Sequence, residues 1–70
     1  RDTDVDTIYN TTDNEEAIAL LAEYNVEYIY VGTLERERYG MEGLLKFASH
    51  PERYKLIYEN MGVEIYQVLP

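Results

Sequence analysis

The β-prone run at residues 26–31 constrains the fold of this chain most. Val26 to Val31 is apolar throughout except for Glu27, and Gly32-Thr33 ends the run. Such a run is typical of a central strand that is covered on both faces. The chain has 70 residues, which is one domain at most, so the remaining elements must pack around this strand.

A strand and a helix are predicted before this run. Val5 to Tyr9 alternates with a period of two, which predicts a strand. Thr12 with Glu15, or Asp13 with Glu16, has the spacing of a capping box, so a helix should follow and extend to about Tyr24. Its apolar positions fall on one helical face. Asn25 is expected to end the helix because asparagine tolerates the left-handed conformation.

Two helices and two strands are predicted after the run. Thr33 can cap a short helix through Tyr39, and a second helix carries an apolar stripe that we expect to be buried, namely Met41, Leu44, Leu45 and Ala48. Residues 54–59 and 63–68 predict two strands. The three residues 60–62 between them suit a hairpin loop with Gly62 in the left-handed conformation.

The element order β-α-β-α-β-β predicts an α/β (α+β) domain with a small four-stranded mixed sheet. The first unit should be a right-handed parallel crossover, and the last two strands a C-terminal antiparallel β-hairpin. With helices on one face, strand alternation places six of the eight tyrosines on the open face: Tyr9, Tyr28, Tyr30, Tyr54, Tyr58 and Tyr66. An exposed patch of this size usually marks an interaction site, so these six are the interface candidates.

Charge and composition exclude several classes of partner. Fourteen acidic and six basic residues give a formal net charge of -8, which repels phosphate backbones and anionic lipids. We therefore expect no nucleic-acid partner and no direct membrane insertion by this segment. The absence of cysteine excludes disulfides and thiolate metal sites. The chain opens on Arg1 rather than methionine, which suggests a piece of a longer protein.

Isolated motifs do not assemble into a catalytic or metal site. Alternating aspartates at residues 2–6 lack the glycine and glutamate that a calcium loop would need at Thr7 and Asp13. The single histidine, His50, has no identifiable nucleophile or second ligand. No metal, cofactor or catalytic residue is predicted.

Two further motifs are weaker site candidates. The turn after residues 26–31 could hold an anion or a sugar through Gly32, Thr33, Arg36 and Arg38, because free N–H groups at a strand-to-helix turn attract anions. An ordinary turn with exposed ion pairs is the alternative, and Glu35 opposes an anion there. Asn10-Thr11-Thr12 is an N-glycosylation sequon in a predicted loop.

Two runs carry a resemblance to a known family: residues 28–40, which contain Tyr-Ile-Tyr-Val-Gly-Thr-Leu-Glu-Arg, and residues 58–66, Tyr-Glu-Asn-Met-Gly-Val-Glu-Ile-Tyr. Together with residues 5–9 and 17–24, they resemble the C-terminal tail of the archaeal and Chloroflexi-type "YYY" multi-spanning membrane proteins. That family is similar to glycosyltransferases that use lipid-linked sugars.

The resemblance implies a non-catalytic, extracytoplasmic C-terminal domain of a glycosyltransferase-like integral membrane protein. Such a domain would dock on the membrane portion of the same protein or help to position an acceptor. The alternative is a free-standing interaction or ligand-binding module in which a second copy is the partner and the tyrosine-rich sheet face is the contact.

Overall fold

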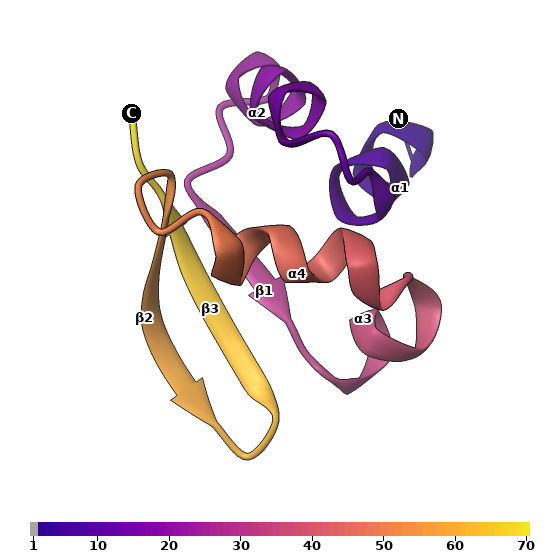
Figure 1. The fold of residues 1–70 in the computed structure, drawn as a ribbon, viewed down its shortest axis with the longest axis vertical. Coiled ribbons are helices and arrows are strands. Elements are labelled where there is room, and N and C mark those ends of the chain that lie inside the picture. Colours follow the sequence, from indigo (N-terminus) through magenta and orange to yellow (C-terminus); the bar gives the residue numbers. More distant parts are fainter. Residues whose placement is uncertain (1) are drawn as a thin grey trace.

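Four helices and three strands make up residues 2–70, the part of the chain that the computed structural model describes (Figure 1). The helices are α1 (Asp2–Asn10), α2 (Asn14–Glu23), α3 (Thr33–Arg38) and α4 (Met41–Ser49). The strands are β1 (Tyr28–Val31), β2 (Tyr54–Asn60) and β3 (Val63–Val68). The mixed α/β class is as predicted, but the predicted four-stranded sheet is wrong.

The predicted N-terminal strand is the helix α1. Val5, Ile8 and Tyr9 are spaced i, i+3, i+4, so the segment that alternates like a strand also presents a helical face. Asp4 in the first turn complements the helix dipole, and the Thr7 hydroxyl donates a hydrogen bond to the Thr3 carbonyl at 2.9 Å. Burial decides between the two structures, because the helix places Ile8 in the core.

The helix α2 begins and ends as the sequence predicts. Of the two capping alternatives, Asp13 is the N-cap, and its carboxylate accepts hydrogen bonds from the backbone N–H groups of Glu15 and Glu16. Asn25 follows the helix in the left-handed conformation, with φ 55°. Ala17 and Leu21 are the buried residues of this helix.

The sheet is antiparallel throughout, with strand order β1-β3-β2, so the predicted parallel crossover is wrong. The central strand is β3, and β1 lies at an edge. Because β1 alternates between exposed and buried residues, the predicted coverage of both its faces is also wrong. The register of β2 on β3 shifts between Leu56 and Tyr58, which leaves Ile57 without a partner, as in a β-bulge.

The last two strands form the predicted hairpin with a shorter loop. Asn60 pairs with Val63, so the loop consists of Met61 and Gly62 alone. Their φ angles are 50° and 87°, and the left-handed conformation predicted for Gly62 is confirmed. Two successive residues with positive φ are typical of the type I′ turn, whose twist matches that of the strands it joins.

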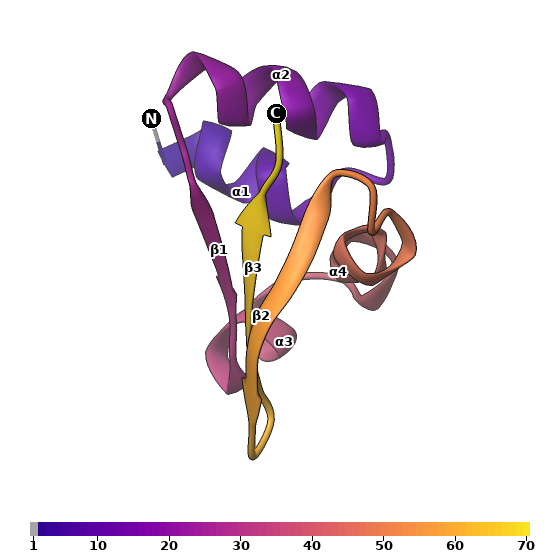
Figure 2. The ribbon, with the colours of Figure 1, turned by 90° about the vertical axis from the view of Figure 1, so that its left-hand side faces the viewer.

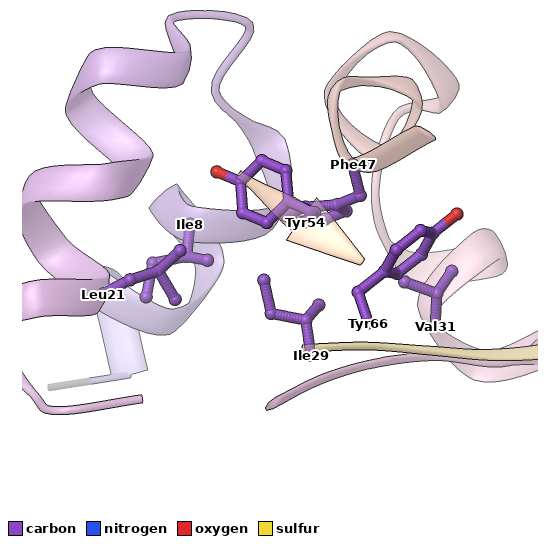
Figure 3. Packing of buried hydrophobic residues seen from close by; sticks show 7 residues of the cluster. All are labelled: Ile8, Leu21, Ile29, Val31, Phe47, Tyr54 and Tyr66. Atoms are coloured by element: carbon purple, nitrogen blue, oxygen red, sulfur yellow. The ribbon is translucent and has the colours of Figure 1, made fainter. Parts of the chain in front are cut away.

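The helices pack around one face of the sheet, which we call the inner face. In Figure 2, α1 and α2 lie together across one end of the strands. Phe47 of α4 is fully buried, with its ring centroid 5.0 Å from that of Tyr54 and 5.9 Å from that of Tyr66 (Figure 3). The core cluster comprises Ile8, Leu21, Ile29, Val31, Phe47, Tyr54 and Tyr66.

Candidate functional site

The six tyrosines predicted to share one open face lie in three different environments. Tyr28, Tyr30 and Tyr58 belong to the uncovered side of the sheet and are 55%, 50% and 48% exposed. Tyr54 and Tyr66 are in the core, at 1% and 5%. Tyr9 belongs to α1 and not to the sheet. The predicted face of six tyrosines is therefore wrong, and three of them remain on it.

The uncovered side of the sheet, which we call the outer face, consists of two rows across the three strands. Residues that pair across an antiparallel ladder share a face, so the register defines the rows. The first row is Tyr30, Ile65 and Tyr58, and the second is Tyr28, Gln67 and Lys55. The first row consists of one aliphatic side chain between two aromatic ones. We therefore expect it to form the centre of any contact through this face.

The outer face carries no carboxylate among these six residues, although the chain has fourteen acidic residues and a net charge of -8. The two glutamates of the hairpin that pair with each other, Glu59 and Glu64, lie on the inner face with Val31. Lys55 is the single charged member of the outer face. A partner can therefore approach this surface without desolvating an acid.

Tyr9, one of the six predicted interface tyrosines, contacts the edge strand of the sheet instead. The Tyr9 hydroxyl donates a hydrogen bond to the backbone carbonyl of Tyr30 at 2.7 Å. Its ring stacks on Tyr39 with centroids 4.7 Å apart, and the Tyr39 hydroxyl donates to Asp6 at 2.7 Å. Burial raises the pKa of Tyr9 to about 12. These contacts hold α1 against the edge strand β1.

The strand-to-helix turn uses its own carboxylate to cap α3. Gly32 is the N-cap rather than Thr33, so the predicted capping by Thr33 is wrong. The Gly32 N–H donates to the Glu35 carboxylate at 2.9 Å, which is the back-bond of a capping box. An anion or a sugar at this turn would have to displace Glu35. A Cβ on Gly32 would also lie 2.8 Å from the Tyr30 ring, so this turn approaches the outer face closely.

The two arginines of the predicted anion contact have partners within the domain. Arg36 donates to the Gly62 carbonyl in the hairpin turn and lies 3.5 Å from the Glu64 carboxylate. Arg38 lies 3.7 Å from Asp6 and 5.7 Å from the centroid of the Tyr39 ring. Both side chains therefore join α3 to neighbouring elements, and the anion contact stays a prediction without a free arginine to support it.

The remaining motifs take local structural contacts. His50 is the C-cap of α4, and its Nδ1 lies 3.0 Å from the Lys46 carbonyl. Asn10 of the sequon accepts a hydrogen bond from the Gly40 N–H at 3.1 Å, and its glycosylation stays a prediction. Within residues 2–70, no group of three or more histidine, cysteine, aspartate or glutamate residues is placed to hold a metal ion.

The sequence did not reveal which side of α4 is buried. The helix is present as predicted, but it buries Gly43, Lys46 and Phe47. Met41 and Leu45 from the predicted buried stripe are 75% and 52% exposed. The single phenylalanine of the chain, Phe47, was the available signal, because phenylalanine is among the side chains most often buried. A groove therefore opens beside the exposed stripe.

Comparisons with known proteins place the chain in no family. Searches against protein-family models, curated proteins and solved structures found nothing that matches it. Of the helices in the described part of the chain, none is long and apolar enough to cross a membrane. The resemblance to the C-terminal tail of the "YYY" membrane proteins stays a prediction.

Proposed function

We propose that this chain is a non-catalytic interaction domain that docks through its outer face on another surface of a larger protein. The observation that carries the proposal is the row formed by Tyr30, Ile65 and Tyr58, which lies uncovered at the centre of the sheet. Tyrosines contribute both apolar area and a hydroxyl group for hydrogen bonding, which suits them to interfaces. Following the resemblance, the expected surface is the extracytoplasmic side of the membrane portion of a glycosyltransferase-like protein.

The size of the outer face favours a tethered partner over a free one. Tyr28, Tyr30 and Tyr58 are each about half exposed. At about 200 Å² for a whole tyrosine, their exposed area is roughly 300 Å². A stable complex of two separate proteins buries about 800 Å² on each partner. The tyrosines alone therefore supply too little area for tight association from solution.

A partner surface on the same chain can be bound in spite of this small contact area. Two surfaces on one chain meet at an effective concentration of the order of millimolar, so a small contact is occupied without high intrinsic affinity. Lys55 adds a single positive charge at the end of the second row, which suits a partner surface that carries carboxylates or carbonyl oxygens. A docking or acceptor-positioning role requires no catalytic group from this domain.

The alternative partner is a second copy of the chain. The absence of carboxylates from the outer face favours this alternative locally. The net charge of -8 on each copy opposes it at long range, and salt screens that repulsion over about 8 Å at physiological ionic strength. Self-association through this face should therefore be weak and should strengthen as salt is added.

Site-specific crosslinking in the longest native protein that contains this chain tests the proposal. A photoreactive amino acid in place of Tyr58 should crosslink to another segment of the same protein. The same group in place of Glu23, an exposed residue of α2, is the matched control and should not crosslink. Analytical ultracentrifugation of the 70-residue chain tests the alternative. A dimer that Tyr30→Glu abolishes would mean that the partner is a second copy of the chain and not another segment of the same protein. If the protein gives no crosslink at Tyr58 and the isolated chain forms no dimer, the proposed function is rejected.

A further inference from the structure

A second candidate surface lies on the inner face of the sheet, opposite the outer face. It is a groove of about 290 Å³ between α4, the end of β1 and the central strand β3. Its lining is mainly apolar: Val31, Met41, Leu44, Leu45, Ala48 and Tyr66, with Arg36 and Glu64 at its polar end. Figure 1 shows that the β2–β3 hairpin extends past α4 and α3, so the helices cover only part of the inner face.

The stripe along α4 gives this groove the form of a helix-packing site. Met41 and Leu45 are spaced i, i+4, and both are more than half exposed. Leu44 and Ala48 repeat the same spacing and also line the groove. Side chains four residues apart form the ridge that a neighbouring helix packs against. A helix beside α4 would therefore continue the layer that covers the inner face.

Charge beside the groove favours a basic helix, because Glu59, although it does not line the groove, is the cross-strand neighbour of Glu64, which does. Glu59 and Glu64 pair directly across β2 and β3, and like charges opposite each other on a sheet are unfavourable. Arg36 lies 3.5 Å from Glu64, while Glu59 has no ion pair within residues 2–70. The Tyr66 hydroxyl also donates to Glu64 at 3.2 Å. One carboxylate of the pair is thus left for a cation from outside.

The net charge disfavours the other occupants of the groove. A second copy would bring a further formal charge of -8 and helices that are rich in acid, with carboxylates in the first turn of α2, α3 and α4. An anionic lipid surface is repelled for the same reason. We infer that the groove between α4 and the hairpin binds an amphipathic helix with lysine or arginine beside its apolar stripe, contributed by a partner protein segment.

A pair of synthetic helices tests this inference by amide NMR shifts on the 70-residue chain. The first is a peptide of about 18 residues of leucine and lysine with leucines at helical spacing, and the second has glutamate in place of lysine. The basic peptide should shift the amides of residues 41–48 and those of Glu64 and Tyr66, the two residues of β3 that line the groove. Leu45→Gln should weaken binding about tenfold, because half of the leucine side chain is available for burial.

Charge variants separate the groove from general attraction to an acidic protein. Glu59→Gln should weaken binding of the basic peptide about threefold, with the difference shrinking at high salt. Glu23→Gln removes the same charge from α2 and should leave the affinity unchanged. Met41→Gln repeats the test at a residue that is 75% exposed, should Leu45→Gln not fold. Equal binding of both peptides, equal effects of the two glutamate variants, or shifts on the outer face would overturn the inference. None of the expected effects involves the outer face, so the inference and the proposed function can fail independently.

Discussion

Gly43→Ala should destabilise the domain strongly, contrary to the effect expected from helix propensity. Gly43 lies in the interior of α4, where alanine normally gains about 1 kcal/mol over glycine. A Cβ at this position would lie 2.4 Å from the Tyr9 carbonyl oxygen and 2.5 Å from that of Asn10. Both are backbone atoms at the end of α1, so no side chain can rotate away to make room.

The magnitude follows from the contacts that join α1 to α4. Overpacking of this kind costs about 3 kcal/mol at the upper end of its usual range. If α1 shifts to avoid it, the hydrogen bonds from Lys46 to Tyr9 and from Gly40 to Asn10 weaken, each worth about 1 kcal/mol. After subtraction of the helix-propensity gain of about 1 kcal/mol, the expected net loss is about 2 kcal/mol if α1 stays in place and about 1 kcal/mol if it shifts.

Urea denaturation followed by circular dichroism measures this loss. Gly40→Ala is the control, because a Cβ there meets no atom within 4 Å and the residue is an N-cap without a side-chain bond. It should cost less than about 1 kcal/mol. A Gly43→Ala variant as stable as the parent chain, or more stable, would mean that α1 does not pack on α4.

In the Gly43→Ala variant, amide hydrogen exchange should in addition be faster in α1 than in β3.

Three further changes test other elements. Burial lowers the pKa of Lys46 from 10.5 to about 8. Between these two pH values the unfolded chain therefore binds more protons than the folded chain. The free energy of unfolding should rise with pH by up to about 1.4 kcal/mol per unit between pH 8 and 10, and Lys46→Met should show no such rise. Met61→Asn should raise the urea midpoint by the equivalent of about 0.5–1 kcal/mol, because asparagine tolerates a φ of 50° better than methionine. Asp13→Ala should lower thermal stability by about 1 kcal/mol, whereas Thr33→Ala, at the position after the N-cap, should change it by less than about 0.5 kcal/mol.

Local signals in the sequence predicted the elements that depend on neighbours in the chain. The helix that starts after Asp13, its end at Asn25 and the left-handed Gly62 of the hairpin follow from capping and turn chemistry. The prediction of a strand at residues 5–9 was wrong because the apolar residues of this segment fit both the period of a strand and that of a helix. The choice between them depends on packing against α2 and α4, which involves residues far along the chain.

The faces of the sheet could not be predicted because they depend on register. Tyr54 and Tyr58 are four residues apart, so regular alternation places them on one face. The bulge at Ile57 adds one residue between them, and Tyr54 turns inward while Tyr58 stays outward. Tyr66 is buried because it pairs with Ile29 across the ladder. Neither the bulge nor this pairing has a signal in the local sequence.

The same bulge has a consequence for how the chain behaves at high concentration. A flat edge strand offers its backbone as a template for further strands, which is how ribbons and fibrils grow. One edge of this sheet is closed where Tyr9 holds the Tyr30 carbonyl, and the other is bent by the bulge at Ile57. Crowding should therefore bring copies together face to face, in assemblies that stop at a pair, rather than edge to edge in polymers without a fixed length.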